Sequence, residues 1–191
     1  DLPTARLFRG LGFASMRADW APEATFATFF CQPTWHGGHQ HADNNSFVIH
    51  RNGLLAVDSG VYDATEHRGN YYARSIAHNT VTVTDPNEVF GGATWGGGRP
   101  GAGANDGGQM YVGGADLVTD VGPETAFARA EILAYESGEE LTYVVGDATA
   151  SYAPGKVVEF TRAFLFVRPS TFVVFDRVES ADPTHVKRWL L

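Results

Sequence analysis

The chain is poor in the residues on which disulfide frameworks, long helices and nucleic-acid surfaces depend. Its 191 residues include one cysteine, two methionines and two lysines, Lys156 and Lys187. One cysteine cannot form an internal disulfide, so cysteine usage does not indicate a compartment. Long amphipathic helices are poorly supplied with Lys and Met. A formal net charge of −8 argues against nucleic-acid binding, which relies on Lys and Arg to neutralise phosphates.

The sequence also lacks an apolar run long enough to span a bilayer, and no signal peptide is visible, so we expect no membrane partner. The single cysteine, Cys31, follows the apolar run 26–30. This position predicts a buried and unreactive thiol. The acidic balance does not exclude acidic sugars, because a locally basic cleft can still hold an anionic ligand.

What the chain does contain is a regular series of strand signals. Hydrophobic residues make up 43% of the sequence, which is enough for a substantial core. We expect strands at 25–31, 47–51, 54–58, 80–84, 110–121, 127–136, 141–147, 157–167 and 171–178. Asn52-Gly53 predicts a hairpin, and Arg168-Pro169-Ser170 predicts a second tight connection. The pattern indicates an all-β fold, a large antiparallel β-sandwich.

The limits of this domain are predicted as residues 1–191, with truncation at both ends. Residues 186–191 have the pattern of a strand that is cut off while still running, so we expect a neighbouring strand or domain. The glycine-rich segment 91–108 is expected to be a long surface loop. It is not a phosphate-binding loop, which would need a Lys and a helix N-terminus.

Imidazoles and carboxylates gather in the first half of the chain. Zinc is often bound by three protein ligands of the His and Asp type, and His41, Asp58 and His78 satisfy that pattern. Residues two apart lie on the same face of an extended strand, so His39 would face the same pocket without ligating. Asp43 is expected to support a ligand from outside the coordination shell. The alternative is a purely hydrogen-bonded polar cluster.

The hairpin tests whether these ligands can meet. A two-residue loop at Asn52-Gly53 would place Asp58 opposite Phe47, on the same face as His41. At about 3.3 Å per residue, Phe47 and His41 would lie roughly 20 Å apart in a straight strand. A single metal site therefore requires a bend or bulge at residues 44–46.

Three linked motifs occur in chain order and form the most specific signal in the sequence. They are Trp35–Phe47, Gly53–Tyr62 and Tyr71–Thr80, with a weaker match at Asn105–Gln109. Together they resemble the heparinase II/III-like polysaccharide lyases. The resemblance implies a β-sandwich packed against an upstream α/α toroid, with a polysaccharide cleft between them. It makes this chain the sandwich part of a larger protein.

The resemblance also implies residue functions. By position, His41, Asp58 and His78 match zinc ligands, and His39 matches a histidine at the catalytic centre. The family's main catalytic Tyr and another His lie on the toroid, and nothing in this chain replaces them. The implied substrate is a uronic-acid-containing polysaccharide, glycosaminoglycan-like or alginate-like, and the implied location is periplasmic or secreted.

The chemistry of β-elimination explains the need for such residues. A lyase removes the proton α to a uronate carboxylate and expels the 4-linked sugar, so it must neutralise the carboxylate, supply a base and protonate the leaving oxygen. We expect His39 to transfer a proton or neutralise charge, while the metal fixes the strands around it; direct Lewis-acid action is the alternative. Tyr71 or Tyr72 would contact the sugar or pack as core aromatics. Arg74 would bind a uronate or sulfate, or form a salt bridge.

Two other functional classes fit parts of the pattern. One is a metal-stabilised carbohydrate-binding β-sandwich without catalytic activity. The other is a cupin-type oxygenase, which also uses two histidines separated by one residue. A cupin would need a Glu a few residues later, and Asn45-Ser46-Phe47 supplies none. The lyase is our leading hypothesis and the carbohydrate-binding module its alternative; an upstream toroid with Tyr and His would favour the lyase.

Overall fold

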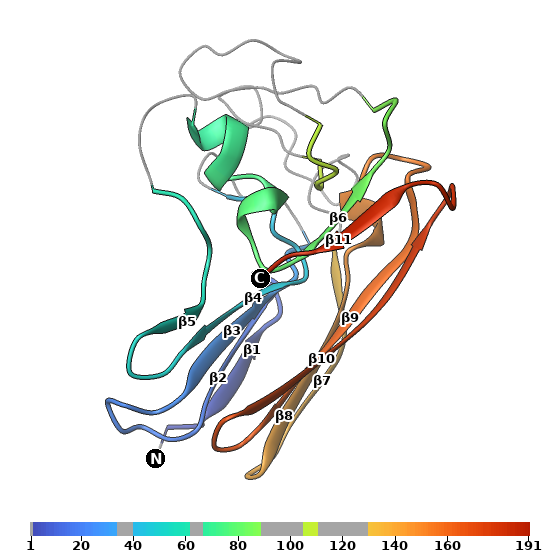
Figure 1. The fold of residues 1–191 in the computed structure, drawn as a ribbon. Helices are drawn as coiled ribbons and strands as arrows, with labels where there is room; N and C mark the ends of the chain where they lie inside the picture. The colour runs from blue at the N-terminus through green and yellow to red at the C-terminus, as the bar shows by residue number, and fades with distance from the viewer. Residues whose placement is uncertain (1, 34–39, 62–66, 89–104, 111–129) are drawn as a thin grey trace.

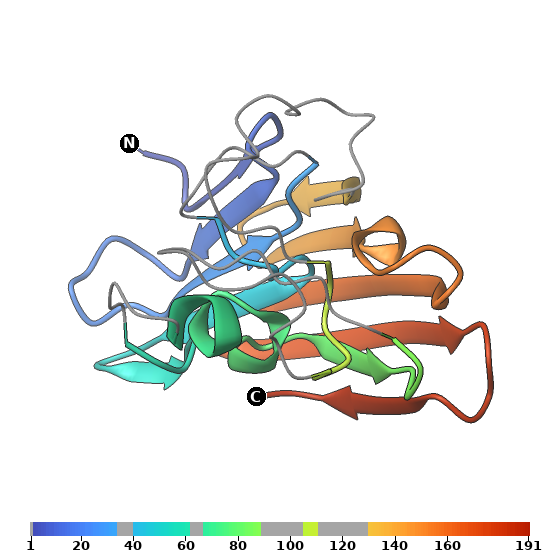
Figure 2. The ribbon, with the colours of Figure 1, turned by 90° about the horizontal axis from the view of Figure 1, so that it is seen from above.

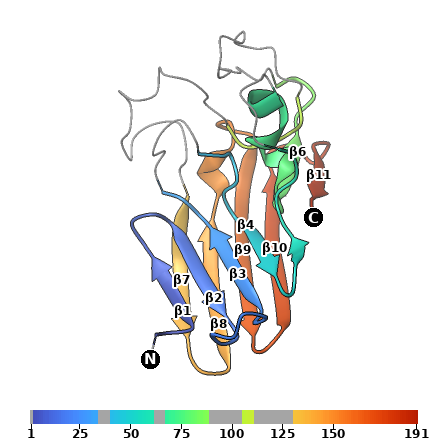
Figure 3. The same cartoon turned by 90° about the vertical axis from the view of Figure 1, so that its left-hand side faces the viewer.

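Two antiparallel sheets face each other in the computed structural model, which describes residues 2–33, 40–61, 67–88, 105–110 and 130–191 (Figures 1 and 3). The first sheet has the order β1-β2-β3-β4-β5 and the second has the order β10-β9-β8-β7. The strands of the first sheet are β1 (Ala5–Phe8), β2 (Phe13–Arg17), β3 (Phe26–Phe30), β4 (Ser46–His50) and β5 (Leu54–Ala56). The strands of the second sheet are β7 (Glu131–Ser137), β8 (Leu141–Asp147), β9 (Val157–Val167) and β10 (Thr171–Ser180). This arrangement confirms the predicted antiparallel sandwich.

Short elements close one end of the two sheets. A two-stranded ribbon pairs β6 (Val81–Thr84) with β11 (Val186–Trp189). Three helical turns, η1 (Arg68–Tyr72), η2 (Ser75–Ala77) and η4 (Thr149–Ser151), also belong to this end. Figure 2 shows η1 and η2 lying over the sheet ends. In the part of the chain that the structure describes, no helix is long and apolar enough to cross a bilayer.

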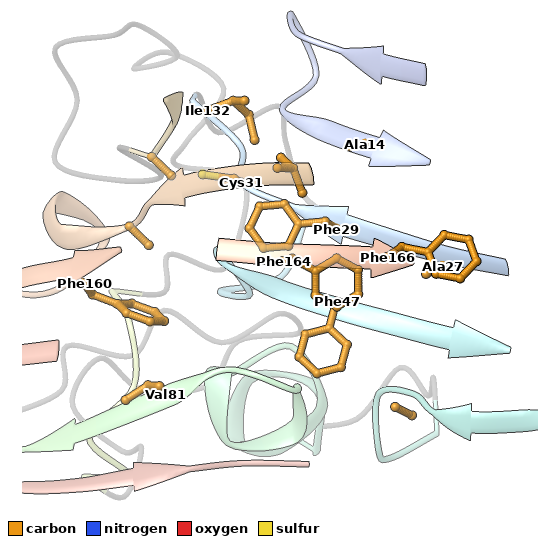
Figure 4. Packing of buried hydrophobic residues seen from close by; sticks show 14 of the residues in the cluster. Ala14, Ala27, Phe29, Cys31, Phe47, Val81, Ile132, Phe160, Phe164 and Phe166 are labelled. Atoms are coloured by element: carbon orange, nitrogen blue, oxygen red, sulfur yellow. The ribbon is translucent and has the colours of Figure 1, made fainter. Parts of the chain in front are cut away.

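An aromatic core fills the space between the sheets (Figure 4). Buried residues alternate along β9, so Phe160, Phe164 and Phe166 all point inward, as expected for a strand with one face on the core. Across the interface, the ring centroid of Phe164 lies 5.0 Å from that of Phe47 and 5.9 Å from that of Phe29. These contacts hold β9 of one sheet against β3 and β4 of the other.

Most expected strands are present, within a few residues of their predicted ends. The segment expected at 110–121 lies almost wholly outside the described residues. Residues 186–189 form a strand, as predicted. Cys31 is fully buried, its Sγ donates to the backbone oxygen of Glu131 at 3.2 Å, and burial raises its pKa. The prediction of a buried, unreactive thiol agrees with this environment.

The hairpin exists, but its ladder ends before Asp58. Asn52 (φ 52°) and Gly53 (φ 143°) form the turn, and Ile49 pairs with Ala56 as a two-residue loop requires. A bulge follows beside His50, and β5 ends at Ala56. Asp58 therefore lies beyond the ladder, and its predicted pairing with Phe47 is wrong.

The predicted bend before β4 is present. Asn45 adopts a left-handed conformation (φ 57°), which Asn tolerates better than most residues. The amide of Ser46 donates to the oxygen of Asp43 at 2.9 Å and closes the turn. His41 thus precedes the turn and is not part of a strand, so the argument that His39 and His41 share a strand face does not apply.

Candidate metal centre

Three segments bring their polar residues to one end of the sandwich. His41 lies ahead of the turn that enters β4, Asp58 follows β5 by two residues, and His78 directly follows η2. Backbone hydrogen bonds join these segments. The amide of Ala42 donates to the backbone oxygen of Ala73, and the amide of Ser59 donates to the backbone oxygen of Ala77, each at 2.8 Å. The positions of the three side chains are therefore set by contacts between neighbouring residues.

The three side chains converge. One potential ligand atom from each of His41, Asp58 and His78 lies within 4.8 Å of the other two. The imidazole centroids of His41 and His78 are 5.0 Å apart, and Nδ1 of His78 is 2.8 Å from Oδ1 of Asp58. The His78 side chain is fully buried, whereas that of Asp58 is 39% exposed. The group of three is thus buried at His78 and accessible to solvent at Asp58.

The His78 ring shows that this group suits a cation. Both ring nitrogens are buried and lack a hydrogen-bond partner of normal geometry among the described residues, although Asp58 lies close. Buried polar atoms are almost always satisfied. Two imidazoles and one carboxylate match the ligand set of zinc with a further position open. A cation between the three side chains would bind one of these two ring nitrogens.

The surrounding charges favour a positive centre. Burial lowers the pKa of His78, but the contact with Asp58 and the charge of Asp43 outweigh burial, so the pKa lies above its ordinary value. Burial also raises the pKa of Asp43 to about 6, although the charge of His78 opposes this rise. Gln32 donates to Oδ1 of Asp43 at 3.1 Å. The charges of Asp43 and His78 thus act on each other, and a supporting role for Asp43 outside the coordination shell stays a prediction.

A buried amide network fixes the turn below His41. The backbone amide of Asn44 donates to Oε1 of Gln109 at 2.9 Å, and Nε2 of Gln109 returns a bond to the oxygen of Asn44 at 2.7 Å. The side-chain oxygen of Asn44 accepts a hydrogen bond from the backbone amide of Gln32 at 2.6 Å, and its side-chain nitrogen donates to Oγ of Ser151 at 3.0 Å. The turn is thus held from three distant parts of the chain.

The predicted substrate-contacting residues have different environments. Tyr71 is partly exposed, its hydroxyl lies 2.6 Å from Oγ of Ser59, and its ring stacks on His67 at 5.3 Å. Tyr72 is 4% exposed, with its ring 5.9 Å from that of His41. Arg74 is equally buried and forms a 2.9 Å ion pair with Asp106. His39, the predicted catalytic residue, lies outside the described residues.

The sequence analysis missed Arg162. This β9 residue is fully buried, and its guanidinium donates to the backbone oxygens of Asn45 and Asn79, both at 2.7 Å. Asn79 follows His78 directly. A signal was available, because Arg162 occupies an inward position in the alternation that includes Phe160 and Phe164. An Arg at such a position needs buried partners.

A comparison with protein families matches almost the whole chain. The model for the C-terminal part of heparinase II/III-like proteins matches residues 1–190. The chain belongs to this heparinase II/III-like family. A search of curated proteins found no match.

Solved structures of heparinase-like proteins share the fold. The heparan sulfate lyase HepC from Pedobacter heparinus superposes with a TM-score of 0.63 at 19% identity, covering 94% of this chain. A heparinase III, the BT4657 gene product with methylated lysines, gives 0.61 at 21% identity and 94% coverage. Another heparinase III gives 0.58 at 18% identity and 92% coverage. The chain spans 23%, 23% and 22% of these proteins.

Proposed function

We propose that this chain is the β-sandwich part of a polysaccharide lyase that cleaves a uronic-acid-containing polysaccharide by β-elimination, with zinc bound by His41, Asp58 and His78. The observation that carries the proposal is the convergence of these three side chains within 4.8 Å at one end of a heparinase-like sandwich. The remaining catalytic groups would come from an upstream α/α toroid. A periplasmic or secreted location is part of the same proposal.

The proposed ion would supply positive charge and hold three chain segments in fixed positions. His39, two residues before a proposed ligand, would transfer a proton or neutralise the uronate. Tyr71 is the strongest candidate for direct sugar contact, because its ring is partly exposed and its hydroxyl is oriented by Ser59. Tyr72 and Arg74 would act from beneath the surface, Tyr72 beside His41 and Arg74 through Asp106.

Elemental analysis of the purified chain tests the metal site. We expect about one zinc per chain, and we expect His41→Ala and His78→Ala to lose it because each removes one of three ligands. His50→Ala is the matched control, since His50 lies on β4 and outside the three-residue group. Full metal content in His41→Ala would refute the ligand set.

The reaction is tested on the full-length protein that contains this chain. Incubation with heparan sulfate, other glycosaminoglycans and alginate should raise the ultraviolet absorbance through the unsaturated product of elimination. His39→Ala should abolish the rise while zinc content is retained. Hydrolysis products without this absorbance would refute the lyase. Saccharide binding with no cleavage would support the carbohydrate-binding alternative.

A further inference from the structure

We propose that Arg162 is a positioning residue for the metal centre, which sets the separation between the turn after His41 and the segment of His78. The inference rests on the proposed metal function. The hydrogen bonds of Arg162 go to the backbone of Asn79, which is adjacent to His78, and of Asn45, in the turn that follows His41. Its effect on the ion would therefore act through the two loops.

A single guanidinium nitrogen joins the two loops. Nη1 of Arg162 donates to the oxygen of Asn45 at 2.7 Å and to the oxygen of Asn79, also at 2.7 Å. Asn45 belongs to the turn that enters β4, and Asn79 is adjacent to His78. Because both oxygens bind the same atom, neither loop can move away from the other without breaking a buried hydrogen bond.

The Nε and Nη2 edge of the guanidinium is also fixed by hydrogen bonds. Nε and Nη2 donate to the two carboxylate oxygens of Asp176 on β10, each at 2.7 Å. The indole of Trp189 donates to the same carboxylate at 2.7 Å. Arg162 lies 5.5 Å from the ring centroids of Phe47 and Trp189. This bidentate pairing orients the group, since the planar fork of Arg fits a carboxylate in one plane.

Stability alone does not account for this arrangement. A buried ion pair often contributes no more than a well-packed apolar pair of the same size, because removing two charges from water is costly. The sandwich already has apolar side chains on both sides of Arg162 in β9, Phe160 and Phe164. What an apolar side chain at position 162 cannot do is donate to two carbonyls in two different loops.

The nearest comparison is an ion pair on the same two strands. Arg177 of β10 lies 3.3 Å from Glu159 of β9, but its side chain is 68% exposed. Arg177 pairs in the ladder with Thr161, next to the pairing of Asp176 with Arg162. Arg177→Met therefore removes an Arg of the same hairpin without touching either loop.

Zinc titration of the purified chain tests the proposal. Supporting bonds outside a coordination shell typically contribute about 10–100-fold to metal affinity, so we expect Arg162→Met to weaken zinc binding by that factor. Arg177→Met should bind as the wild type does. Phe166→Leu, a core change on β9 without contact to either loop, controls for loss of stability. It should lower the melting temperature and leave the dissociation constant unchanged.

The outcomes separate the two proposals. If the wild type does not bind zinc, the metal function fails and this inference fails with it. If the wild type binds zinc and a folded Arg162→Met binds it within twofold, only the positioning inference is refuted. If Arg162→Met does not fold, Asp176→Asn answers the same question, because it keeps the side-chain shape and weakens the hold on the guanidinium. An unchanged dissociation constant in Asp176→Asn would then refute the inference.

Discussion

The middle and the C-terminal part of β9 form two different kinds of interior. Toward its C-terminal end, Phe164 and Phe166 pack against other aromatic rings, and shape and area decide the contacts. At its midpoint, Arg162 contacts the turn at Asn44-Asn45, and both are just as buried, but directional hydrogen bonds decide their contacts. The first region tolerates repacking. The second region fixes positions, which is what a binding centre requires.

The largest effect should come from the aromatic region. Phe164→Ala removes a fully buried ring that touches Phe29 and Phe47. We expect a loss of about 3–5 kcal/mol in the free energy of unfolding, measured by chemical denaturation. Zinc affinity of the folded fraction should not change. Phe175→Ala, on the exposed face of β10, should lose far less; a changed zinc affinity in Phe164→Ala would show that the two regions are not separate.

Gly146→Ala should lower the free energy of unfolding by less than Phe164→Ala does, but, unlike Phe164→Ala, it should also weaken zinc binding. A methyl group at this buried β8 position would lie 2.2 Å from the side-chain oxygen of Asn45 and 2.8 Å from Sγ of Cys31. Crowding of this kind typically destabilises by about 1–3 kcal/mol. Because Asn45 must shift, zinc affinity should fall as well. Gly138→Ala, where a methyl group meets no atom within 4 Å, should change neither quantity in denaturation and zinc titration.

The smallest effect is expected at the surface. Glu159→Gln breaks the exposed pair with Arg177, and such pairs contribute about 0–1 kcal/mol. Denaturation at low salt should therefore show a small loss that disappears as salt is added. A loss above that range would mean that the exposed pair and the buried Arg162–Asp176 pair are energetically coupled across the hairpin.

The difference between aromatic packing and directional hydrogen bonding also explains what could be predicted from the sequence. Alternating burial leaves a pattern of period two, so β8, β9 and β10 were found nearly to their ends. The grouping of His41, Asp58 and His78 followed from ligand chemistry and from the family resemblance, and the structure brings the three together. The bend at Asn44-Asn45 followed from chain geometry.

The failures have equally physical reasons. The predicted pairing of Asp58 with Phe47 failed because β5 ends at Ala56, and the local sequence does not fix where the ladder stops. Arg162 escaped notice because two of its partners are backbone oxygens in remote loops, which no side-chain pattern encodes. The exposure of Tyr71 and the burial of Tyr72, adjacent in sequence, depend on the path of η1.

The distance along the chain between Arg162 and the loops bears on the order of assembly. The Arg162–Asn79 hydrogen bond joins residues 83 positions apart, whereas His41, Asp58 and His78 lie within one shorter stretch. Contacts across long loops form late, since more chain entropy is lost before they close. During synthesis the three ligands would emerge before β9, and we expect them to hold an ion only loosely until β9 joins the sheet. Tight retention would then mark a finished domain.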